Sequence, residues 1–95
     1  MRKYEIMFIV KPDLEEKQTK DIISSLTKVF TDNKCKIVDK KEIGLKELSY
    51  EIKGFKKGFY YWLEVLASQE VIAEFNRLLG INENIIRYIV CKDEE

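Results

Sequence analysis

Apolar residues follow two different spacings along this chain. Four stretches are β-prone, and within them apolar residues often recur at every second position, as in a strand with one buried face. In two other stretches they recur three and four positions apart, as on one face of a helix. The strands are expected at about 4–10, 35–52, 59–66 and 85–91, and the helices at about 14–32 and 68–80.

Local residues indicate where the helices begin and end. Asp13 and Glu16 have the separation of a capping box at the start of the first helix. Ser68 is suited to cap the second helix, because its hydroxyl can accept a hydrogen bond from a backbone N–H in the first turn. The polar pair at 32–33 is expected to stop the first helix, and Gly80 the second.

The order β-α-β-β-α-β predicts an α+β fold of the ferredoxin-like, split β-α-β type. Its four-stranded antiparallel sheet has the first and third strands in the centre and both helices on one face. Gly44 is expected to mark a bulge in the long second strand, and 54–58 a turn before the third. We expect one domain over 1–92, followed by a short acidic tail at 93–95.

The alternation also predicts which side chains turn toward the helices and which turn away. Those expected to face the helices are Tyr4, Ile6, Phe8, Val10, Phe59, Tyr61, Leu63, Val65, Tyr88 and Val90. The apolar residues expected on the opposite, free face are Met7, Ile9, Tyr60, Trp62 and Ile89. Basic residues expected at the border of that face are Arg2, Lys3, Arg87 and Lys92. An exposed apolar patch usually marks a binding surface, so these five apolar residues predict a partner-protein surface.

Charge is balanced overall but unevenly distributed. The chain has 17 basic and 17 acidic residues, which argues against simple binding of a polyanion. Between residues 34 and 58, however, eight lysines face four acidic residues, a net charge of +4. The rest of the chain compensates with a net charge of −4. One segment of the protein is therefore basic, and it includes the turn before the aromatic strand.

The residue content argues against several classes of protein. There is no histidine, and Cys35 and Cys91 form no C-x-x-C pair, so zinc and thioredoxin-like sites have no support and no cofactor is expected. Acylphosphatases share this fold but need a glycine-rich anion loop with an arginine after the first strand, where this chain has 10–13, Val-Lys-Pro-Asp. The paired carboxylates at 15–16 and 94–95 fall in a helix's first turn and in the tail, so no enzyme is predicted. No apolar run approaches the length of a membrane span.

Two non-enzymatic alternatives remain open on the residues alone. The segment KGFYYWLE matches the third-strand motif of RNA-recognition domains at Lys57, Gly58, Phe59 and Tyr61. It departs from that motif at Tyr60, Trp62 and Glu64. The other alternative is a ferredoxin-like regulatory or dimerisation module that binds a small molecule or a protein through the free face. Such a module should self-associate.

Four segments together resemble the bacterial small-subunit ribosomal protein number six family. They are the opening MRKYEIMFIVKPDL, the central IGLKELSYEI, the strand KGFYYWLEV and the closing NENIIRYIVCK. The resemblance spans essentially the whole chain, in order. It implies a structural protein of the cytoplasmic ribosome, a monomer when free. Such a protein pairs with small-subunit ribosomal protein number eighteen as a heterodimer and binds the central domain of 16S-type rRNA.

The resemblance also carries a set of expected rRNA-binding residues. They are Arg2, Lys3, Lys46, Lys56, Lys57, Arg87 and Lys92. Two positions depart from the family pattern, which usually has a proline where Glu51 stands and often a second base where Glu47 stands. Both changes add acid beside the basic hairpin, and they put its contact with RNA in doubt.

Overall fold

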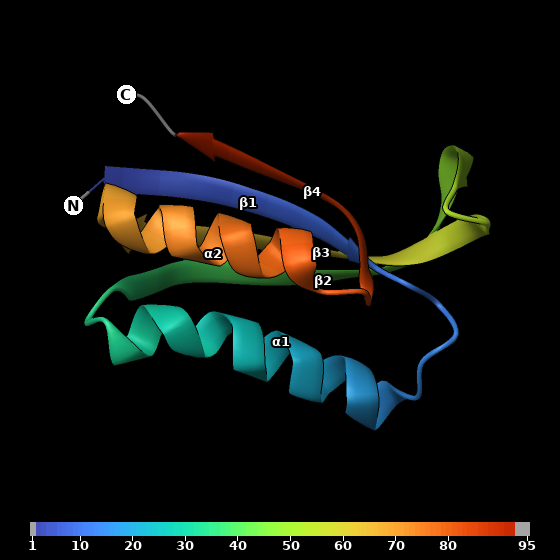
Figure 1. Cartoon of the computed structure of the whole chain (residues 1–95), viewed down its shortest axis with the longest axis horizontal. Helices are drawn as coiled ribbons and strands as arrows, with labels where there is room; N and C mark the ends of the chain where they lie inside the picture. Colours follow the sequence, from blue (N-terminus) through green and yellow to red (C-terminus); the bar gives the residue numbers. More distant parts are fainter. Residues whose placement is uncertain (1, 93–95) are drawn as a thin grey trace.

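The computed structural model describes residues 2–92, which form four strands and two helices (Figure 1). In chain order the elements are β1 (Arg2–Val10), α1 (Glu16–Asp32), β2 (Lys36–Ile52), β3 (Phe55–Ala67), α2 (Gln69–Ile81) and β4 (Ile85–Lys92). The expected acidic tail at 93–95 lies outside the described residues.

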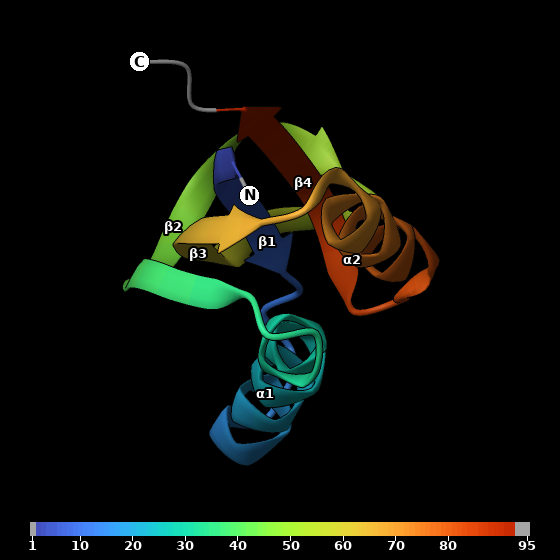
Figure 2. The ribbon, with the colours of Figure 1, turned by 90° about the vertical axis from the view of Figure 1, so that its left-hand side faces the viewer.

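The strands form one antiparallel sheet in the order β2-β3-β1-β4, which confirms the predicted fold and its two central strands. Each helix connects two strands that run in the same direction with one strand between them, as right-handed crossovers do. Figure 2 shows α1 and α2 on the same side of the sheet. The other side of the sheet, the free face, is left without a helix.

The helix ends agree with the sequence in part. Ser68 caps α2 as predicted, because its hydroxyl accepts the Val71 N–H at 3.3 Å. At the start of α1 the expected Asp13 cap is wrong. Glu15 occupies that position instead, and its N–H donates to the Gln18 side chain at 3.1 Å. The capping box thus has the expected separation of three residues, but it joins Glu15 to Gln18, two positions after the predicted pair.

Gly80 does not stop α2, which continues to Ile81 and is followed by the cap residue Asn82. The reason for a glycine here is tertiary. A Cβ at position 80 would lie 2.9 Å from the Tyr88 hydroxyl, so the missing side chain makes room for an aromatic ring from β4. A glycine that resembles a helix stop in the sequence is thus a packing site.

The turn between β2 and β3 is tighter than expected. It consists of Lys53 and Gly54, with φ of +50° and +84°, and β3 already begins at Phe55. Positive φ at both positions is what a two-residue type I′ hairpin requires, and its twist matches that of the flanking strands. The predicted turn at 54–58 is therefore wrong. The predicted bulge at Gly44 is confirmed by a break in the β2–β3 register and a φ of +101°.

The core lies between the sheet and the two helices. The predicted inward residues of β1 and β3 are buried there, except Phe59, which is half-buried against the core. Phe8 stacks on Tyr61 with ring centroids 5.6 Å apart. Phe30 of α1 and Phe75 of α2 meet at 4.6 Å and are fully buried. Each such ring contributes about 1.5–3 kcal/mol by leaving water. Burial also raises the pKa of Tyr61 to about 12, so this phenol stays neutral and donates to Glu42 at 3.5 Å.

Candidate functional site

The centre of the free face is an apolar row that crosses three strands. Trp62 of β3 lies opposite Met7 of β1, and Met7 lies opposite Ile89 of β4. Residues directly opposite each other in an antiparallel sheet share a face. On the other side of Trp62, the Lys41 ammonium of β2 lies 5.2 Å from the centre of the indole ring. This row, Lys41–Trp62–Met7–Ile89, confirms that Met7, Trp62 and Ile89 lie on the free face. It also contains Lys41, which was not among the residues expected there.

Ile9 is on the free face but is not exposed, so its expected place in an exposed patch is wrong. Only 7% of it is accessible, and Ile86 of β4 is equally covered at 5%. Both side chains pack over the backbone of Gly58 in β3. The register of β1 and β4 breaks between Ile9 and Val10, which brings Ile86 beside Ile9. These three residues form a small second cluster, separate from the main core.

An acidic row lies beside the apolar row. Asp39 of β2, Glu64 of β3 and Glu5 of β1 occupy successive opposed positions across the sheet. The Lys3 ammonium lies 3.1 Å from the Glu64 carboxylate. Lys3, expected to bind RNA, is therefore engaged on the free face with an acid. Only the pairing of the strands shows that these three carboxylates adjoin one another.

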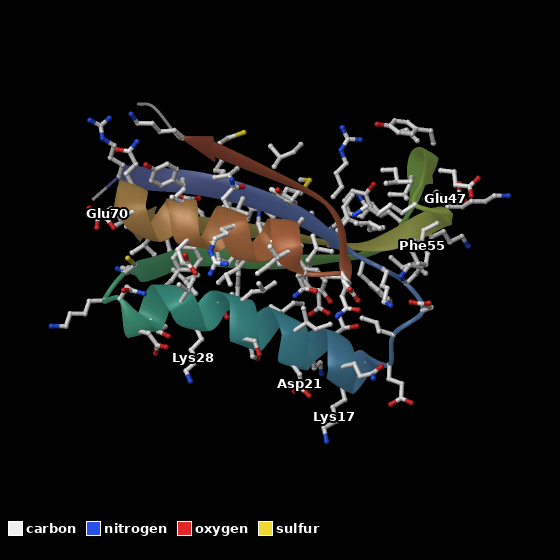
Figure 3. The ribbon with its side chains drawn as sticks, viewed as in Figure 1. Lys17, Asp21, Lys28, Glu47, Phe55 and Glu70 are labelled. Carbon is white, nitrogen blue, oxygen red and sulfur yellow. The ribbon has the colours of Figure 1, made fainter. Side chains whose placement is uncertain are left out.

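Three of the expected RNA-binding lysines lie along the distal half of the β2–β3 hairpin, the part beyond Gly44. Lys46 is paired with Gly58, and Lys57 with Glu47. Lys56 and Lys57 share a shallow pocket with Glu47 and Glu51, the two acids that depart from the family pattern. Figure 3 labels Glu47 on this hairpin, which projects from one end of the sheet. The two lysines and two glutamates that line this pocket balance each other in charge.

Arg87 joins this hairpin to β4. Its guanidinium donates a hydrogen bond to the Tyr50 hydroxyl and lies 5.8 Å from the centre of the Tyr50 ring. Both residues are exposed. Arg87 lies opposite Ile9 in the sheet, so it borders the free face as predicted. It is held over that face by a tyrosine from a distant part of the chain.

Arg2 and Lys92 occupy the other end of the sheet and the other face, so their expected place at the border of the free face is wrong. Arg2 has the same strand parity as the buried Tyr4, and Lys92 lies opposite Tyr4. Together they line a groove of about 820 Å³ between the sheet and α2. The seven expected RNA-binding residues are thus divided among this groove, the free face and the hairpin.

Other kinds of site find no support among residues 2–92. These residues contain no cluster of acidic or cysteine side chains suited to a metal ion. Cys35 is buried just before β2, and Cys91 is exposed on β4, so the two thiols belong to opposite edges of the sheet. No helix in this part of the chain has the length and apolar character needed to cross a membrane.

Comparison with known proteins identifies the family. The family model for ribosomal protein S6 matches residues 3–92. The chain is 56% identical to small ribosomal subunit protein bS6 of Shouchella clausii, and 50% identical to that of Aster yellows witches'-broom phytoplasma. Both alignments cover all of each chain.

A solved structure agrees. The crystal structure of 30S ribosomal protein S6 from Thermotoga maritima superimposes with a TM-score of 0.90 at 26% identity, covering 97% of this chain and 87% of that one. The members of this family are structural components of the small subunit in the cytoplasmic ribosome, and they are not enzymes. Because the family model matches nearly all of the chain and the fold agrees, this protein belongs to the ribosomal protein S6 family of the small ribosomal subunit.

Proposed function

We propose that this protein binds the central domain of small-subunit rRNA together with small-subunit ribosomal protein number eighteen, and that the free face is the surface that receives the protein partner. One observation carries the proposal: the free face combines an apolar row with an acidic row, while five of the seven expected RNA-binding residues lie on the hairpin or on the other face of the sheet. Protein and RNA would then use different parts of the surface.

The free face suits a basic protein better than RNA. Trp62, Met7 and Ile89 offer apolar and aromatic surface of the kind found at the centre of protein interfaces. Glu5 and Glu64 would repel phosphates at short range, but they attract lysine and arginine. Trp62 is half-buried beneath Lys41 and is flanked by Met7, which suits packing against a protein more than stacking of a splayed base.

A neutral chain is expected to bind RNA weakly alone, because affinity for RNA depends on how many phosphates are neutralised. A basic partner seated on the acidic row would add the missing charge. Arg87 and the hairpin lysines at one end, and Arg2 with Lys92 at the other, would then position the pair on the RNA backbone.

The test is a binding titration over a salt series. The purified chain is mixed with a central-domain rRNA fragment, with and without the partner protein. We expect tight binding only for the pair, with log affinity falling against log salt by about 0.7–0.9 for each phosphate neutralised. Arg87→Ala should weaken binding and reduce that slope by about one phosphate, whereas Lys28→Ala, on the outer side of α1 (Figure 3), should change neither.

The proposal fails if the pair shows no affinity for the rRNA fragment at low salt. A homodimer that forms with rising protein concentration would then favour the regulatory or dimerisation module. Sedimentation of the free chain measures this directly, and we expect a monomer.

A further inference from the structure

Tyr50 of β2 and Arg87 of β4 meet although they belong to opposite edges of the sheet. The strand order β2-β3-β1-β4 places two strands between them. The Arg87 guanidinium nevertheless donates a hydrogen bond to the Tyr50 hydroxyl and lies 5.8 Å from the centre of the Tyr50 ring. Figures 1 and 2 show that the β2–β3 hairpin extends beyond the other strands and that its tip turns toward β4. The contact therefore depends on the bend of this hairpin.

An irregular segment of β2 accounts for the bend. Between the pair Glu47–Lys57 and the next pair toward the tip, β2 has four residues and β3 has only one. Extra residues in one strand bend that strand, increase its twist and often re-aim a side chain. Tyr50 is one of these extra residues. The bulge thus explains how a side chain of one edge strand reaches a side chain of the other.

Arg87 keeps its charge available for a ligand. Among residues 2–92 it makes no salt bridge, and the side-chain interactions described for it are both with a phenol and not with a carboxylate. A guanidinium has five N–H donors, so the hydrogen bond to Tyr50 leaves donors for a bidentate contact with a phosphate. Arg87 is exposed, and Tyr50 is 60% exposed, so the pair can be reached from solvent.

We infer that Tyr50 is a positioning residue, which holds the Arg87 guanidinium in place for a phosphate of rRNA and does not itself contact the RNA. Ordering a free arginine side chain on binding costs affinity. A guanidinium that packs on an aromatic ring and donates to its hydroxyl has already lost part of that freedom. The inference rests on the proposed function, in which Arg87 contacts RNA, and it names the residue that prepares this contact.

The experiment measures binding of the central-domain rRNA fragment by the chain with its partner protein, over a salt series. Tyr50→Leu removes the ring and the hydroxyl, and we expect rRNA affinity to fall about three- to tenfold. The salt slope should stay unchanged, because Arg87 still neutralises its phosphate. Arg87→Ala removes the charge itself and should reduce the slope by about one phosphate. Tyr50→Phe keeps the ring without the hydroxyl, and its affinity should fall between those of the unmodified and Tyr50→Leu chains.

A double-mutant cycle separates positioning from direct contact. In the Arg87→Ala background there is no guanidinium to hold, so Tyr50→Leu should have no further effect on rRNA affinity. Leu45→Ala is the matched control, because Leu45 is 51% exposed on the same strand but lies opposite Phe59, on the side of the sheet that faces the helices. It should change neither the affinity nor the slope. In the free chain, the heteronuclear NOE of the Arg87 Nε–H group should fall when Tyr50 is replaced by leucine.

An equal loss from Tyr50→Leu with and without Arg87 would overturn the inference, because Tyr50 would then contact the RNA directly. Weaker binding of the partner protein in the absence of RNA would overturn it as well, by assigning Tyr50 to the partner surface. If the pair binds the rRNA fragment and Tyr50→Leu leaves the affinity unchanged, the inference alone fails. If the unmodified pair does not bind the fragment, the proposed function fails and the inference falls with it.

Discussion

Replacing Trp62 with alanine should weaken binding of small-subunit ribosomal protein number eighteen by about 30-fold or more. Tryptophan near the centre of an interface commonly contributes about 2 kcal/mol or more when it is truncated. Trp62 has the central position in the free-face row, between Lys41 and Met7. Isothermal titration calorimetry of the two purified proteins measures the change in affinity.

A matched variant keeps this result interpretable. Phe55→Ala removes a half-buried aromatic ring from the same strand, at the tip of the hairpin and away from the row (Figure 3). We expect it to leave partner affinity near that of the unmodified chain. Unchanged affinity for Trp62→Ala would remove the row from the interface, and a crosslink from Trp62 to an RNA base in the assembled particle would assign it to RNA instead.

Gly58→Ala should destabilise the protein by about 1–3 kcal/mol, the usual effect of overpacking a filled site. Glycine usually weakens a strand, so replacing it with alanine would ordinarily raise the free energy of unfolding. A decrease would therefore point to crowding at this position. The new methyl group would overlap the Cγ2 of Ile9 and lie 3.3 Å from the Cδ1 of Ile86 and 3.4 Å from the Val10 carbonyl oxygen. Ile9 is branched at Cβ and is nearly buried, so it has little room to turn. Urea unfolding measures the change.

The second cluster can be tested by a double-mutant cycle. Ile9→Ala removes the colliding methyl group and should itself be destabilising. In that background Gly58→Ala should cost less than it does alone, because the space it needs has been opened. Equal costs in both backgrounds would show that Gly58 and Ile9 do not compete for the same space. The cluster adjoins Arg87, which lies opposite Ile9 in the sheet.

These features divide the surface into three regions. The apolar and acidic rows occupy the middle of the free face, Arg87 and the hairpin lie at one end, and the groove of Arg2 and Lys92 lies at the other end beneath the opposite face. Basic side chains thus lie at both ends of the sheet, and carboxylates lie on the free face between them.

Local spacing was enough to predict much of this molecule. The two helices, the four strands and the side of the sheet on which Phe8, Tyr61, Trp62 and Met7 lie all follow from periods of 2 and 3.6 residues, because those periods are properties of the backbone itself. The bulge at Gly44 and the Ser68 cap were likewise visible locally.

Turns and glycines were less well predicted, for a physical reason. Glycine suits a turn, a helix end and a crowded contact equally well, so the sequence does not say which of these it serves. Gly54 is in the turn, Gly80 makes room for Tyr88, and Gly58 lies beneath Ile9. Only the neighbouring element in space distinguishes these roles.

The sequence by itself determined the fold, the family pattern and the two faces of the sheet. The tertiary structure decided which charges meet: Arg2 with Lys92 in one groove, Glu5 with Glu64 on the free face. Residues far apart in the chain become neighbours only when strands pair in a particular register, and a single bulge changes which of them are opposed. Electrostatic interactions depend on distance in space, so the binding surfaces emerge only once that register is known.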